Sequence, residues 1–82
     1  MKGTIIVTQR ELVNCPEMEQ ILLQLSDSVA REGDNTLFFS REGALMTMIC
    51  ELLDKDVKYT LNFEKGTEQS IEGQVKVGAA NT

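Results

Sequence analysis

The chain has 82 residues, of which 41% are hydrophobic, and eight basic against thirteen acidic residues give it a net charge of −5. This length and composition predict one folded domain, and the acidic balance disfavours nucleic acid and anionic membranes as partners, because both bind concentrated basic surfaces. Histidine is absent, which excludes Ser-His and Cys-His catalysis and most zinc sites.

The two cysteines, Cys15 and Cys50, are too few for a disulfide framework, and no metal-ligand spacing surrounds either of them. Met1 is not followed by a signal-peptide segment, and no apolar stretch is long enough to span a bilayer. We therefore expect a cytoplasmic protein without a metal or cofactor.

The first expected element is a strand over residues 4–8, Thr-Ile-Ile-Val-Thr, because β-branched residues dominate this segment. Its three consecutive apolar residues indicate a strand in the interior of the sheet. A polar stretch then leads towards residue 14.

A long helix over about residues 15–32 is expected next. Asn14 is a favourable N-cap, Glu17 stands at capping-box spacing from it, and Pro16 falls where a missing N–H costs nothing. Gly33 suits the C′ position that ends a helix. The apolar residues that share one face at helical spacing are Met18, Ile21, Leu22, Leu25 and Val29.

A short strand at 36–39 precedes a second helix, which Ser40 is expected to cap and which runs to about Asp54. This helix is apolar over more of its circumference than an ordinary amphipathic helix. Cys50 is expected in the core or in an interface. The wide apolar face indicates contact with a partner protein or a second copy of the chain, through the residues Leu45, Met46, Met48 and Ile49.

Alternating apolar and polar residues predict a strand at 57–63 and a returning strand at 71–77. The element order is then βαβαββ, in a single α+β domain over 1–78 followed by a frayed tail over 79–82. We expect a two-layer sandwich, with two helices on one face of a mixed four-stranded sheet. Its first two strands would be parallel and joined by a right-handed crossover, and its last two would form a hairpin.

Cys15 is the candidate reactive residue, because a cysteine that opens a helix faces unpaired N–H groups and the positive end of the helix dipole. Both favour the thiolate, which is the nucleophilic form. Glu17 and Glu19 lie within the next turn and oppose that effect. The alternative is that Cys15 is a small residue packed at a helix boundary.

The chain resembles the TusA-like (SirA-like) small sulfur-carrier proteins, which have a βαβαββ fold and a Cys-Pro-x-Pro motif at the start of the first helix. The matching features are Leu12, the triplet Cys15-Pro16-Glu17, Gly33 at the end of the first helix, the apolar strand at 36–39 and the terminal hairpin. The likeness covers most of the chain. Met18 stands where the family has its second proline.

The resemblance implies a sulfur carrier, or a protein like a sulfurtransferase, that holds a persulfide on Cys15. Asn14, Pro16 and Glu17 would shape the helix start around the thiol. The sulfur would come from a cysteine desulfurase or another carrier and pass to an acceptor protein. A second hypothesis stays open, in which the chain is not an enzyme. It would be an acidic interaction or regulatory module that acts through the second helix, as a homodimer or with a basic partner.

Overall fold

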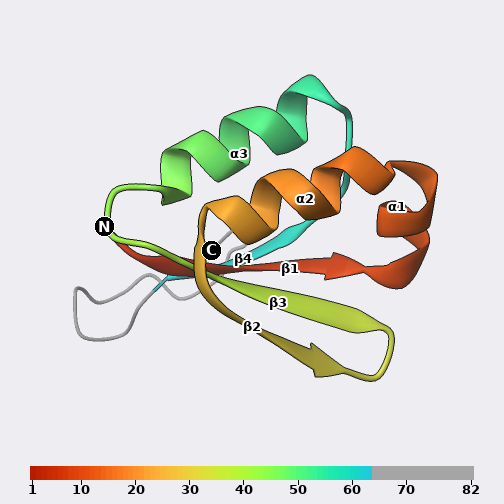
Figure 1. Cartoon of the computed structure of the whole chain (residues 1–82), viewed down its shortest axis with the longest axis horizontal. Coiled ribbons are helices and arrows are strands. Elements are labelled where there is room, and N and C mark those ends of the chain that lie inside the picture. Colours follow the sequence, from red (N-terminus) through yellow and green to blue (C-terminus); the bar gives the residue numbers. More distant parts are fainter. Residues whose placement is uncertain (64–82) are drawn as a thin grey trace.

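A four-stranded antiparallel sheet carries two helices on one face and a short helix at one end (Figure 1). The structure is a computed structural model, and it describes residues 1–63. The elements in chain order are β1 Gly3–Thr8, α1 Gln9–Asn14, α2 Pro16–Gln24, β2 Ser26–Glu32, β3 Asn35–Ser40, α3 Leu45–Asp54 and β4 Thr60–Phe63. The expected α+β class is confirmed, and two helices do lie on one face of the sheet (Figure 1). The expected order βαβαββ is wrong, because the described residues form three helices and the strand β2 follows the second of them.

The strand order is β2-β3-β1-β4, and every neighbouring pair is antiparallel. The prediction of an interior first strand is confirmed, since Ile5 faces Phe38 of β3 on one side and Leu61 of β4 on the other. The mixed sheet is wrong, as is the parallel crossover between the strands at 4–8 and 36–39. The helices α1 and α2 together connect β1 to β2. Counted as one connection, they give the element order β-α-β-β-α-β, which is the split βαβ arrangement.

The expected helix over 15–32 begins where predicted, since α2 starts at Pro16 after the N-cap residue Cys15, but it ends at Gln24 and not near residue 32. Helical structure begins earlier, at α1, where the Thr8 side chain accepts a hydrogen bond from the Glu11 N–H at 3.4 Å. It is interrupted at Cys15 (φ −141°, ψ 74°), because the ring of Pro16 excludes the helical conformation from the residue before it. The first half of the expected helix is therefore α2, and α1 is a separate short helix before it.

The second half of that expected helix is the strand β2. The Ser26 hydroxyl donates to the Leu22 carbonyl at 2.6 Å where α2 ends, and serine in this role competes with continued helical bonding. Glu32 then faces Asn35 across a two-residue turn in which Gly33 has φ +59°. Gly33 is thus a hairpin residue and not a helix C′ residue, and a positive φ at this point favours glycine.

Ser40 does not cap the second helix. Its hydroxyl is buried and accepts a hydrogen bond from the Gly3 N–H at 3.0 Å, which ties β3 to the start of β1. The helix α3 begins at Leu45, after Ala44, without a side-chain cap. A Cβ on Gly3 would lie 2.9 Å from both the Asn62 carbonyl oxygen and the Leu45 side chain, so this close approach requires glycine.

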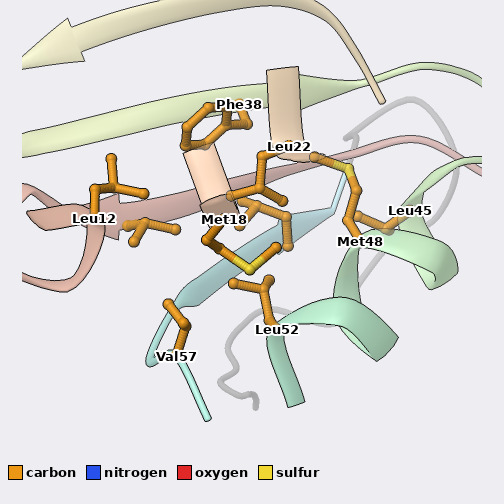
Figure 2. Packing of buried hydrophobic residues seen from close by; sticks show 10 residues of the cluster. Leu12, Met18, Leu22, Phe38, Leu45, Met48, Leu52 and Val57 are labelled. Carbon is orange, nitrogen blue, oxygen red and sulfur yellow. The ribbon is translucent and has the colours of Figure 1, made fainter. Parts of the chain in front are cut away.

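The core lies between α2, α3 and the face of the sheet they cover, as Figure 2 shows for the side chains that converge there. The strand residues alternate: Ile5, Val7 and Phe38 are fully buried under the helices, and Ile6 and Phe39 on the other face are only partly buried. The helices and the following loop contribute Leu12, Met18, Leu22, Leu45, Met48, Leu52 and Val57.

The C-terminal elements are described only in part. The strand expected at 57–63 is confirmed for β4, whereas Val57 is a buried residue of the preceding loop. The expected strand at 71–77, the terminal hairpin, the domain boundary at 78 and the tail over 79–82 lie outside the described residues.

Candidate functional site

Cys15 is the N-cap residue of α2, so its predicted position at a helix start is confirmed. Its N–H donates to the Glu11 carbonyl at 3.1 Å, and its carbonyl accepts from the Met18 N–H at 2.9 Å. The side chain is partly buried and packs against the core. The thiol is thus neither fully enclosed nor freely presented to solvent.

The surroundings of Cys15 match the sequence analysis only in part. Pro16 is the first residue of α2, as expected. Asn14 is the exposed last residue of α1, and no side chain caps α2, so the Asn14–Glu17 capping box is wrong. Glu17 and Glu19 do occupy the first turn of α2, where their charges favour the helix and oppose a neighbouring thiolate.

Within residues 1–63, no ion pair or hydrogen bond to the Cys15 thiol is found. The arrangement permits a partly exposed thiol to react with a small or flexible electrophile. The chain has no histidine that could act as a general base here.

Two of the four residues expected in an interface on the second helix belong to the core. Leu45 and Met48 are 1% and 0% exposed and point into the packed layer between α3 and the sheet (Figure 2). Ile49 is partly buried against the same cluster. Of the four residues expected in the interface, only Met46 is exposed. The assignment of Leu45 and Met48 to an interface is therefore wrong.

A second apolar line does lie on the outer side of α3. Met46 is 55% exposed, Leu53 is 66% exposed, and Cys50 between them is also exposed. These three residues, called the α3 stripe below, are four and three positions apart, which places them along one side of a helix. Cys50 is therefore not a core residue. The sequence contains a signal for this division. The apolar residues of α3 form two sets at helical spacing, one of which lies in the core and the other of which is the α3 stripe.

Acidic groups predominate around the α3 stripe. Lys55 forms an ion pair with Glu51 at 3.0 Å and one with Asp54 at 3.6 Å. The hydrogen bond that the Lys55 ammonium donates to the Glu51 carboxylate raises the pKa of Lys55 above its usual value, so this amine stays charged at neutral pH. Along residues 41–56, the carboxylates Glu42, Glu51, Asp54 and Asp56 outnumber the cations Arg41 and Lys55, and the amino terminus of Met1 forms an ion pair with Glu42.

A shallow hollow of about 880 Å³ lies where β1 ends, beside α1 and the loop before β4. Arg10 and Lys58 line it together with Glu11 and Asp34, so opposite charges balance. A carboxylate oxygen of Glu11 is already occupied by the Lys58 N–H at 3.1 Å. The hollow therefore favours neither an anion nor a cation.

In the described range 1–63, no group of three or more His, Cys, Asp or Glu side chains is placed to hold a metal ion. No helix in the same part of the chain has the length and apolarity needed to cross a membrane.

Comparison of the chain with protein-family models, with curated proteins and with solved structures finds no match.

Proposed function

We propose that this protein is an interaction module that binds a protein partner through the α3 stripe. The observation that carries the proposal is the exposure of Met46, Cys50 and Leu53 along one side of a helix whose other side is the core. Apolar side chains gathered at one place on a small domain mark a contact surface more often than scattered ones do. The helix is held in place by Leu45, Met48 and Leu52, so the stripe is presented on a rigid element.

The partner is a protein surface or helix that presents apolar side chains flanked by lysine or arginine. The apolar part of such a surface would cover the α3 stripe, and its cations would face the carboxylates near α3. Complementary charge at the rim of an interface mainly accelerates association and selects the partner. The net charge of −5 on the chain would also favour a basic partner.

A defined probe tests this proposal: a helical peptide with leucine along one face and lysine along the other. We expect NMR shift changes at α3 when the peptide is added, and weaker binding by Leu53→Ser. Burial of an exposed leucine side chain contributes about 1.5–3 kcal/mol, and Leu53 is 66% exposed. Its loss should therefore raise Kd by about tenfold.

Val13→Ser is the matched control, because Val13 on α1 is 63% exposed and lies outside the α3 stripe. This variant should keep the affinity of the original protein. A peptide with glutamate in place of lysine should bind more weakly, because its charges meet carboxylates. Equal losses in Leu53→Ser and Val13→Ser, or shift changes spread over the whole surface, would reject the α3 stripe as the binding site.

A second function is proposed on a separate observation, the partly exposed thiol of Cys15 at the start of α2. In this function Cys15 carries sulfur. Its thiolate would attack the outer sulfur of a donor protein's cysteine persulfide. The donor S–S bond would break, a new S–S bond would form on Cys15, and the donor cysteine would leave as a thiolate, with no net oxidation.

Incubation with a cysteine desulfurase and cysteine tests the carrier function. The expected result is a mass gain of one sulfur atom that is absent from Cys15→Ser and present in Cys50→Ser. Cys50 serves as the control because it is the more exposed thiol but lies in mid-helix. Sulfur found on both cysteines, or on neither, would contradict a carrier role for Cys15.

A further inference from the structure

The hollow at the end of β1 is formed by three segments that are far apart in the sequence. They are residues 6–11, residues 34–35 and residues 58–60, which meet at the end of the sheet where β1 leads into α1 (Figure 1). Two hydrogen bonds join them. The Gln9 N–H donates to the Asp34 carbonyl at 2.7 Å, and the Lys58 N–H donates to a carboxylate oxygen of Glu11 at 3.1 Å. The walls of the hollow are therefore held together by contacts that involve the main chain.

The cations of the hollow have no partner among the described residues. Residues 1–63 contain six lysine and arginine side chains, and four of them form an ion pair or a hydrogen bond within this range: Lys2, Arg31, Arg41 and Lys55. The other two are Arg10 and Lys58, and both line the hollow. The carboxylate of Asp34, in the same lining, also has no ion pair or hydrogen bond within residues 1–63.

An apolar surface adjoins these charges. Ile6 faces Thr60 across the β1–β4 pair, on the side of the sheet opposite the helices, and both residues line the hollow. Ile6 and Tyr59 are partly buried, so each presents part of its side chain to a ligand. A volume of about 880 Å³ lies within the range of small-molecule sites.

We propose that this hollow binds a small zwitterion that carries one carboxylate and one ammonium group, a chemistry shared by free amino acids and short peptides. The carboxylate binds the guanidinium of Arg10, which can donate two parallel hydrogen bonds to it, and Lys58 adds a second positive charge. The ammonium group donates to the Asp34 carboxylate. An apolar side chain of the ligand covers Ile6 and Tyr59.

The mixture of charges selects a zwitterion over a ligand of one sign. Arg10 and Lys58 attract an anion that Asp34 and Glu11 repel, and the reverse holds for a cation. Only a ligand with both charges is attracted by all four groups. Binding is weak, with a Kd of about 1 mM or more, because exposed charges are screened by solvent and salt. The hollow shares no residue with the α3 stripe, so the inference does not depend on the proposed function.

NMR titration with L-leucine and with L-leucyl-L-leucine, each to about 20 mM, tests the proposal. We expect saturable shift changes in residues 6–11, 34–35 and 58–60. A response to L-leucine alone identifies the ligand as a free amino acid, and a response to the dipeptide alone identifies it as a short peptide. The N-acetyl form lacks the ammonium group and the amide form lacks the carboxylate. Each should bind at least about fivefold more weakly than the zwitterion.

Two variants separate the two charge contacts. Arg10→Gln should bind the amide form as well as the zwitterion, because the carboxylate contact is lost, and Asp34→Asn should do the same for the N-acetyl form. Lys2→Gln is the matched control, since Lys2 is partly exposed at the other end of β1 and outside the hollow. Circular dichroism melts check that all variants fold.

Three results would overturn the proposal. The first is the absence of saturable shifts at the hollow with both zwitterions. The second is a blocked form that binds the original protein as tightly as its zwitterion, because one charge would then suffice. The third is an equal loss of affinity in Lys2→Gln and Arg10→Gln, which would show a general charge effect.

Discussion

Met48→Glu is expected to lose most of the stability of the folded state. Met48 is 0% exposed and lies between α3 and the sheet, among Leu45 and Leu52. A carboxylate at this position would have to be ionised without a partner or be protonated, and both cost free energy. We expect a cost of about 4 kcal/mol or more, which is comparable with the whole stability of many small domains. Urea unfolding followed by circular dichroism measures it.

Met46→Glu is the matched control on the same helix, since Met46 is 55% exposed. Its free energy of unfolding should change by less than about 0.5 kcal/mol, as is usual for surface substitutions. If Met48→Glu shows no folding transition at all, Met48→Ala supplies the number, with an expected loss of about 2–5 kcal/mol. Equal effects of the two glutamate variants would contradict the assignment of Met48 to the core and of Met46 to the surface.

Phe38→Ala is expected to destabilise the protein by about 3–5 kcal/mol, because it leaves a large cavity beneath the helices. Phe38 is fully buried and faces Ile5 of the central strand and Val29 of the edge strand. Urea unfolding followed by circular dichroism gives the difference in unfolding free energy between Phe38→Ala and the original protein.

Phe39→Ala tests the other face of the same strand. Phe39 is partly buried and faces Thr4 and Ser28 on the side of the sheet opposite the helices. We expect a loss of about 1 kcal/mol, because less apolar surface returns to water. A larger loss in Phe39→Ala than in Phe38→Ala would mean that the two faces of β3 are interchanged.

Local signals in the sequence predicted several elements well. β-branched residues located the strand found as β1, and the apolar run at 36–39 lies within β3. The second helix ends at Asp54, as expected. These elements depend on residues that are close in sequence, so propensity and periodicity identify them.

The region around β2 was mispredicted because two local patterns compete there. Leu25 and Val29 continue the helical spacing that begins at Met18, so periodicity alone favours a longer helix. The polar run at 26–28 and the Gly33-Asp34 pair instead favour a turn and a hairpin, and the structure has the hairpin. The extra strand β2 reverses the direction in which β3 runs beside β1. The sequence did not predict this direction, because strand pairing depends on residues that are far apart in the chain.

The candidate sites were also predictable only in part. The helix start at Cys15 follows from Pro16, but the partial burial of its thiol depends on packing against distant parts of the chain. The apolar character of α3 is evident in the sequence, whereas its division between the core and the α3 stripe depends on how the helix is rotated above the sheet. A helix that is apolar over most of its circumference does not specify that rotation.

The pairing of β1 with both β3 and β4 has a consequence for how the chain folds during synthesis. Gly3 faces Phe63, so β1 completes its hydrogen bonding only with β4, the last strand of the described residues, which is synthesised much later. Contacts between such distant positions slow folding, because the loop that joins them must close first. Until β4 is available, one edge of β1 stays unpaired although Ile5 and Val7 lie under the helices, and an open strand edge on a nascent chain is a site for aggregation and chaperone binding.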